Sequence, residues 1–530
     1  MGEKLKRMHE RSMSTPPVEA PHHGVLSRRR LLQATGAGLT AAAVSGRVGI
    51  AGAAPNRRAG AFTSEDIWER NLQLADRGPR LTGNPAHQQF IDSIADDLDR
   101  IGLSAAHDRL TFDRWDPIRW ELSIAGRPVP VAFYFPYSGI TGPEGITGDL
   151  HYLGVLGHFG AWSPARGKIA VVEVPVLPLP ITVGYLASGR YPANSAAPNP
   201  LAYLPSVSDT VGAPSLTGAA AAGVRGVICI RTGVSEALAA DQYAPFTTGY
   251  QGCPALWVGP GVAEQVRADA RRGARAKLVM HARHAMAAST ETVYAVLPGT
   301  HPTESVIINT HTDGPNVAEE NGGIGVLSLA AQFARIPQSR RRRTLVFVFV
   351  TGHFQLPQFE TEVGNGVGTM QASSRWMAMH PELWDGRHGH KKAVAALTLE
   401  HLGCREWLDD DRHVRYAPTG RNEVGWCYCT TPAVRSVYLN SARGTTNVRT
   451  VTCDPLPALY FGEGAPFYKS GIATMSLIPS QSYLTAAPAD GAISKLDKNL
   501  MAGQIATFSN ALNALETMSA EHIGRPTLPI

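Results

Sequence analysis

The chain is poor in the features that mark several protein classes. It has six cysteines in 530 residues, too few for a disulfide scaffold at this length. After the first 53 residues, no apolar run reaches the roughly 18 uncharged residues that a membrane-spanning helix needs. No Gly-x-Ser-x-Gly motif follows a predicted strand, and no Walker-type loop is present. These absences argue against a disulfide-rich module, a later membrane span, a nucleophile-elbow hydrolase and a P-loop protein.

The chain also lacks a strong excess of charge of either sign. It has 49 Lys and Arg against 44 Asp and Glu, and eight of the former and three of the latter lie within residues 1–53. The remainder therefore carries 41 of each. Nucleic-acid binding needs clustered Lys and Arg facing phosphates. Because the one dense basic run, Arg340 to Arg343, is interpreted as a solvated loop, we expect no nucleic-acid partner.

The first 53 residues have the order of an export signal. Arg28-Arg29-Arg30-Leu31-Leu32 is followed by a weakly apolar stretch and then by Ala51-Gly52-Ala53. A charged region, a short apolar region and small residues at a cleavage site define a signal peptide. Paired arginines before two leucines resemble the twin-arginine type. We expect a mature chain that begins near Ala54, in the periplasm, in the cell wall or outside the cell; a disordered basic tail is the alternative.

Two patterns of hydrophobicity divide the rest of the chain. Near-continuous apolar runs at 305–309, 344–350 and 394–399 are typical of strands buried on both faces of a parallel sheet, and helical patterns alternate with them. Between about 125 and 290 the predicted strands are short and separated by Gly and Pro. The sequence predicts an α/β three-layer sandwich around a mostly parallel sheet, formed by 54–124 and 291–530, with a β-rich domain inserted at 125–290 and packed over the active edge of the sheet.

Polar side chains follow each of the three long apolar runs. His311-Thr312-Asp313 comes after the first run, and Glu319-Glu320-Asn321 opens the helix that follows. Thr351-Gly352-His353-Phe354 comes after the second run and Glu400-His401 after the third. In an open α/β sheet, ligands bind outside the carboxyl ends of the strands. Imidazoles and carboxylates that converge there are the groups that a zinc site needs.

In this order the motifs resemble the secreted co-catalytic zinc aminopeptidases, di-zinc exopeptidases with an inserted protease-associated (PA) domain. That family has His-x-Asp after a strand, Asp-Asn opening a helix, Thr-Gly-Glu-Glu after a buried strand, Asp after the next strand, and a late His preceded by Tyr. Arg80-Leu81-Thr82-Gly83 resembles the family's opening, and Gly167-Lys168-Ile169 and 221–228 resemble its PA domain. The resemblance covers essentially all of the chain after residue 53, and it implies an exported hydrolase of peptide or small amide bonds.

The resemblance implies only part of the family's metal site. His311 stands where the family has a ligand, and Asp313 stands where it has the acid that orients that ligand. Glu320 stands in the place of the bridging Asp, and Glu400 in the place of the Asp that binds the same metal. One zinc ion on His311, Glu320 and Glu400 is therefore predicted. The structural alternatives are a His311–Asp313 hydrogen bond, an acid at a helix N-terminus and a structural carboxylate.

The other half of the family's site is changed. His353 occupies the place of the general-base Glu, while Phe354 and Leu484 occupy the places of two ligands and cannot bind a metal. Neutral imidazole can accept a proton near pH 7 or bind zinc, so His353 is predicted as the catalytic residue. Whether His353 or His401 replaces a lost ligand stays open, and a His353 packed beside Phe354 is the structural alternative.

Two functions therefore remain open. The first is an exported, aminopeptidase-like metal hydrolase with a single zinc ion, which the acids retained at 320 and 400 favour. The second is a catalytically silent relative that serves as a binding or scaffolding protein, which the changes at 354 and 484 favour.

Overall fold

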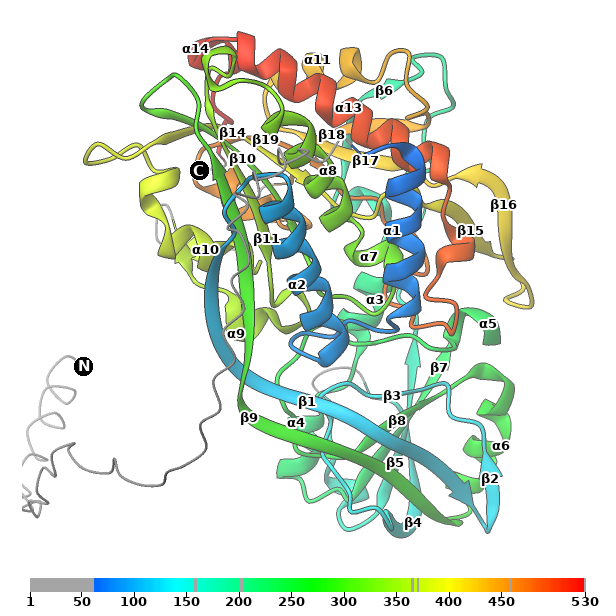
Figure 1. The fold of residues 1–530 in the computed structure, drawn as a ribbon. Helices are drawn as coiled ribbons and strands as arrows, with labels where there is room; N and C mark the ends of the chain where they lie inside the picture. The colour runs from blue at the N-terminus through cyan, green and yellow to red at the C-terminus, as the bar shows by residue number, and fades with distance from the viewer. Residues whose placement is uncertain are drawn as a thin grey trace, which may run out of the picture. The chain divides into compact units, whose positions relative to one another are not determined.

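The structure is a computed structural model that describes residues 62–156, 160–200, 202, 204–363, 367–368, 371–456 and 459–528 (Figure 1). The predicted twin-arginine signal, residues 1–53, lies outside these residues. Within the described part, no helix is both long enough and apolar enough to cross a membrane.

The central sheet follows from the long apolar runs of the sequence. Its strands lie in the order β9-β11-β10-β14-β19-β17-β18-β6. Their bounds are β6 (Leu186–Tyr191), β9 (Arg275–Leu297), β10 (Glu304–His311), β11 (Thr344–Val350), β14 (Lys392–Leu399), β17 (Gly425–Cys429), β18 (Thr450–Asp454) and β19 (Ala473–Leu477). Strands β11, β10, β14 and β19 are parallel. The predicted α/β fold around a mostly parallel sheet is confirmed.

Helices cover both faces of this sheet (Figure 1). Strand β11 contributes to two hydrophobic cores, because successive side chains of a strand point to opposite faces of the sheet. Leu345, Phe347 and Phe349 belong to the core on one face, and Val346, Val348 and Val350 belong to the core on the other. The first core contains α1 (Ser64–Asp76), α2 (Pro85–Arg100), α8 (Gly322–Ala334), α11 (Pro432–Ser441), α13 (Lys498–Thr517) and α14 (Ala520–Ile523). The second contains α9 (Leu356–Phe359), α10 (Ser373–Met379) and α12 (Ala465–Lys469).

The two N-terminal helices begin at residues that suit a helix start. The Thr63 side chain and Asp66 form a capping box at the start of α1. The Asn84 side chain accepts from the N–H of His87, and Pro85 takes the first position of α2. Two main-chain hydrogen bonds hold the segment between the helices against the loop that follows β10. Arg80 N–H donates to the Gly314 carbonyl at 2.8 Å, and Gly314 N–H donates to the Arg80 carbonyl at 2.9 Å.

A second sheet is built from the predicted β-rich stretch. Its strands lie in the order β3 (Phe133–Tyr134), β8 (Ala255–Val258), β7 (Gly226–Thr232), β5 (Ile169–Pro175) and β4 (Ile146–Val155). Helix α6 (Pro260–Arg271) packs on one face and α4 (Leu216–Ala221) on the other, each with its own apolar core. Strand β1 (Ala106–Ile124) pairs with β9 along almost its whole length, and this long ribbon joins the two sheets.

The bounds predicted for an inserted domain, 125–290, stay a prediction. The lower bound falls at the end of β1, but β9 runs through the upper bound without a break. Strand β6 also leaves the stretch and pairs antiparallel with β18 at the edge of the central sheet. The core under α4 lies within the stretch, whereas the core under α6 also includes Trp115 and Phe354, and the described residues form one compact unit.

His87 makes the stability of this fold depend on pH. Its side chain is fully buried, Gly83 N–H donates to Nδ1 at 2.9 Å, and Nε2 lies 2.8 Å from the Thr312 hydroxyl. Burial lowers the pKa of His87 to about 4. Since the unfolded chain binds this proton near pH 6.5, we expect stability to fall as the pH drops from about 6.5 towards 4, by about 2 kcal/mol at pH 5.

Chemical denaturation at pH 7 and pH 5 tests this expectation. His87→Gln should remove that part of the pH dependence, whereas His522→Gln, at an exposed position, should keep it. Equal pH dependence in wild type and His87→Gln would show that His87 is not the source.

Candidate metal centre

The carboxyl ends of β10, β11 and β14 bring three histidines together at one edge of the sheet. The rings of His311 and His353 stack with centroids 4.1 Å apart, and the ring of His401 lies 6.2 Å from that of His311. Glu319, in the short helix α7 (Val317–Glu320), and Glu400 complete the cluster. Donor atoms of His311, Glu400 and His401 lie within 4.8 Å of one another, as do those of His311, Glu319 and His353.

Each imidazole is fixed through its Nδ1. That atom lies 3.0 Å from the Asp313 carbonyl in His311 and 2.7 Å from the Pro479 carbonyl in His401. In His353 it lies 2.6 Å from a carboxylate oxygen of Glu463. Because these oxygens only accept hydrogen bonds, Nδ1 carries the proton in each neutral ring. The Nε2 lone pairs are therefore left for a metal ion or a proton.

Four buried donor atoms of the cluster have no hydrogen-bond partner of good geometry: His311 Nε2, Glu319 Oε2, Glu400 Oε2 and His401 Nε2. Each of these four residues is at most 3% exposed. A buried polar atom without a partner costs about 1–3 kcal/mol, so four of them at one place need a common partner. Two imidazole nitrogens and two carboxylate oxygens make a donor set that suits zinc. The residues present therefore fit a metal ion.

Both groups of donors include His311, and its Nδ1 is taken by the Asp313 carbonyl. Only Nε2 remains, and one nitrogen lone pair binds one ion.

The structure gives the two consecutive glutamates of α7 different surroundings, and the prediction that Glu320 binds a metal stays a prediction. Its carboxylate forms an ion pair with the guanidinium of Arg80, and both side chains are fully buried. Glu320 belongs to neither group of donors. Glu319 faces the histidines instead, with Oε1 3.9 Å from His353 Nε2 and Oε2 3.2 Å from His401 Nε2. Successive helical residues point about 100° apart, so only one of the two can face the cluster.

Asp313 orients His311 in a different way from the one expected. Its main-chain carbonyl, not its carboxylate, contacts the imidazole. The carboxylate accepts hydrogen bonds from the N–H groups of residues 352–354 at 3.0–3.2 Å and from the Thr82 hydroxyl at 2.7 Å. Asp313 therefore fixes the loop that carries His353.

Glu463 is a site residue to which the sequence analysis gave no role. Besides His353, its carboxylate accepts from the N–H groups of Ala372 and Ser373, at 3.3 and 2.7 Å. Its own N–H donates to Glu400 Oε1 at 2.8 Å. Glu463 thus joins the β11 loop to the end of β14.

Buried charge controls the protonation of the cluster. Burial acts to lower the pKa of His353, but the hydrogen bond and the charge of Glu463 outweigh it and raise this pKa to about 9. Burial raises the pKa of Glu400 to about 7. It lowers the pKa of His311 well below the usual range, and His353 and His401 add to this effect.

His401 adopts a backbone conformation that few residues with a side chain adopt. Its φ of 55° lies in the left-handed region. Such conformations cost about 1–3 kcal/mol and gather at functional sites. This one turns the His401 ring toward Glu319.

The remaining side of the site is apolar. Phe354 is buried and makes edge-to-face contacts with Tyr243 and Phe246, each at 5.5 Å. The ring of Phe246 also lies 5.5 Å from that of His353. Leu484 is half-buried, and its carbonyl accepts a hydrogen bond from Asn316 at 2.8 Å. No ligand of a second metal stands at Phe354 or Leu484.

This fold, with ligand-type residues at the carboxyl edge of a parallel sheet, is that of the zinc aminopeptidases. A zinc aminopeptidase from Bacillus subtilis matches 87% of this chain and 97% of its own, with 14% identity and a TM-score of 0.56. An aminopeptidase from Aneurinibacillus sp. strain AM-1 matches 90% and 96%, at 14% identity and a TM-score of 0.54. A peptidase M28 precursor from Shewanella amazonensis SB2B matches 88% and 100%, at 14% identity and a TM-score of 0.57. No family model and no curated protein matches the chain.

The two glutamates of α7 give a matched pair of variants. We expect Glu319→Gln to weaken zinc binding at least about tenfold, measured against a competing chelator, because it replaces a negatively charged ligand by a neutral amide. Glu320→Gln should leave zinc affinity within a few-fold. It should instead lower the free energy of unfolding by about 3–5 kcal/mol, because Arg80 is left buried and unpaired.

The reverse pattern would place the ion on Glu320. If Glu320→Gln does not fold, the double variant Arg80→Met/Glu320→Leu removes both buried charges together. It should restore folding with zinc affinity close to that of the wild type.

Proposed function

We propose that the chain is a metal-dependent hydrolase of peptide or small amide bonds with a single zinc ion. His311, Glu319, Glu400 and His401 would hold the ion, with Glu319 in place of the predicted Glu320. The observation that carries this proposal is a set of four buried donor atoms at one place: His311 Nε2 and Glu400 Oε2 have no hydrogen-bond partner, and His401 Nε2 and Glu319 Oε2 lie 3.2 Å apart. A bound zinc ion would supply Lewis acidity to the reaction.

We propose His353 as the residue that accepts and returns a proton at Nε2. Glu463 fixes its Nδ1, and at 6% exposure His353 is the most accessible of the three histidines. A divalent cation nearby disfavours the imidazolium and would lower the pKa of His353 toward neutrality, where a general base works best. Phe246 and Phe354 keep water away from this side of the ring.

The second candidate is a catalytically silent binding protein. The loss of ligands at Phe354 and Leu484 supports it. The cluster supports the hydrolase, because His353 and His401 add two imidazoles beside the surviving donors.

We also propose that the chain is exported by the twin-arginine route, on the pattern Arg28-Arg29-Arg30-Leu31-Leu32. Residues 1–53 fused to a reporter should direct its export, and Arg29→Lys/Arg30→Lys should keep it in the cytoplasm. Export of the double variant at the wild-type rate would reject the twin-arginine route.

Zinc-dependent turnover tests the hydrolase. We expect the full chain with one equivalent of zinc to cleave some members of a peptide panel, to be weak or inactive on simple amino-acid amides, and to lose activity to a chelator. His353→Ala should lower kcat by about 10²–10⁴-fold, as loss of a general base does, with zinc affinity within a few-fold.

His522→Ala, at an exposed position, is the matched control and should change neither quantity. If one zinc binds and no peptide is cleaved, the chain is a silent relative. If His353→Ala loses zinc along with activity, His353 is a ligand and not the base.

A further inference from the structure

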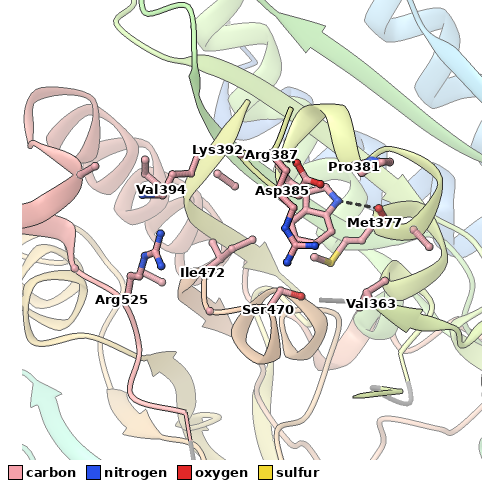
Figure 2. Close-up of a pocket in the computed structure, with 18 of the residues that line it drawn as sticks. Val363, Met377, Pro381, Asp385, Arg387, Lys392, Val394, Ser470, Ile472 and Arg525 are labelled. Atoms are coloured by element: carbon pink, nitrogen blue, oxygen red, sulfur yellow. Dashed lines mark hydrogen bonds between the residues drawn. The ribbon is translucent and has the colours of Figure 1, made fainter. Parts of the chain in front are cut away.

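A hollow of about 730 Å³ lies at the edge of the central sheet opposite the metal centre (Figure 2). Its walls come from the amino ends of β14 and β19, from α10, from β12 (Glu362–Val363) and from residues 520–525. Strand β14 has eight residues and runs from this hollow to Glu400. At about 3.3 Å per residue, the two sites are roughly 25 Å apart.

Cationic side chains face this hollow. Arg387 and Arg525 lie on opposite sides of it, and Lys392 also lines it (Figure 2). Two carboxylates line it as well, but neither forms an ion pair with these cations among the described residues. Asp385 bonds His390 Nδ1 at 2.8 Å and the main-chain N–H of Arg387 at 2.9 Å, and Glu362 is exposed.

A buried donor and an apolar floor complete the hollow. The hydroxyl oxygen of Ser470, which lines it, is buried and has no hydrogen-bond partner. The Trp384 indole N–H already donates to the Met377 carbonyl at 2.8 Å, drawn as the dashed line in Figure 2. The Trp384 ring therefore adds apolar surface, together with the side chains of Val363, Met377 and Ile472.

We propose that this hollow binds a small organic anion. Its carboxylate or phosphate group would lie between Arg387 and Arg525 and accept a hydrogen bond from Ser470, with its apolar body on the floor. Guanidinium groups that face one space repel each other, and an anion between them turns this repulsion into attraction. The planar fork of arginine matches both carboxylate and phosphate oxygens. The volume falls within the range of small-molecule sites.

Three probes test the proposal by calorimetric titration of the full chain: phenylacetate, phenyl phosphate and inorganic phosphate. We expect one site, with phenyl phosphate binding more tightly than inorganic phosphate because its ring covers the floor. Comparison of phenylacetate with phenyl phosphate shows which anionic group the site prefers. Because these anions also bind zinc, each titration is repeated on chelator-treated protein, in which binding should persist.

Variants locate the site. Arg387→Gln and Arg525→Gln should each weaken binding at least about tenfold, since each removes a charge-assisted contact. Arg443→Gln, an exposed cation after α11, is the matched control and should leave affinity unchanged. Four results would each overturn the proposal. They are an equal loss of affinity in the control variant, no loss of affinity in either arginine variant, binding that disappears when the metal is removed, and no binding of any probe below about 10 mM.

Discussion

Four glutamate carboxylates are buried at one edge of the central sheet, and their negative charge constrains everything around them. Glu319, Glu320, Glu400 and Glu463 are each at most 2% exposed. A buried carboxylate is costly unless a cation or hydrogen-bond donors compensate it. Arg80 compensates Glu320, and His353 compensates Glu463. Glu319 and Glu400 are left beside the histidines: Glu319 Oε2 lies 3.2 Å from His401 Nε2, and donor atoms of His311, Glu400 and His401 lie within 4.8 Å of one another. The single divalent cation that we propose would balance the charge that remains.

The proposal of a single ion follows from the same electrostatic constraint. A second ion would need further carboxylates, but the side of the site beyond His353 is formed by Phe354 and Phe246, which offer none. The fold is similar to that of solved zinc aminopeptidases, and the cluster of this chain contains three imidazoles.

The elements that carry the site could be predicted from the sequence, because long apolar runs and helix caps are local signals. The run at 344–350 is β11, and Asn84 and Pro85 start α2. His311 and Glu400 lie at strand ends and do meet in space. The choice between Glu319 and Glu320 could not be made, since it depends on the rotation of a single helical turn. The pairing of Glu320 with the buried Arg80 is visible only in the tertiary structure. Glu463 lies 110 residues after His353, so its role depended on tertiary structure alone.

The number and position of metal ions test this account most directly. A crystal of the zinc-loaded chain, measured at the zinc absorption edge, would show each ion as an anomalous peak. The account predicts one peak, about 2.0–2.2 Å from His311 Nε2, His401 Nε2 and a carboxylate oxygen each of Glu319 and Glu400. Two peaks, or a single peak bound to Glu320, would contradict it.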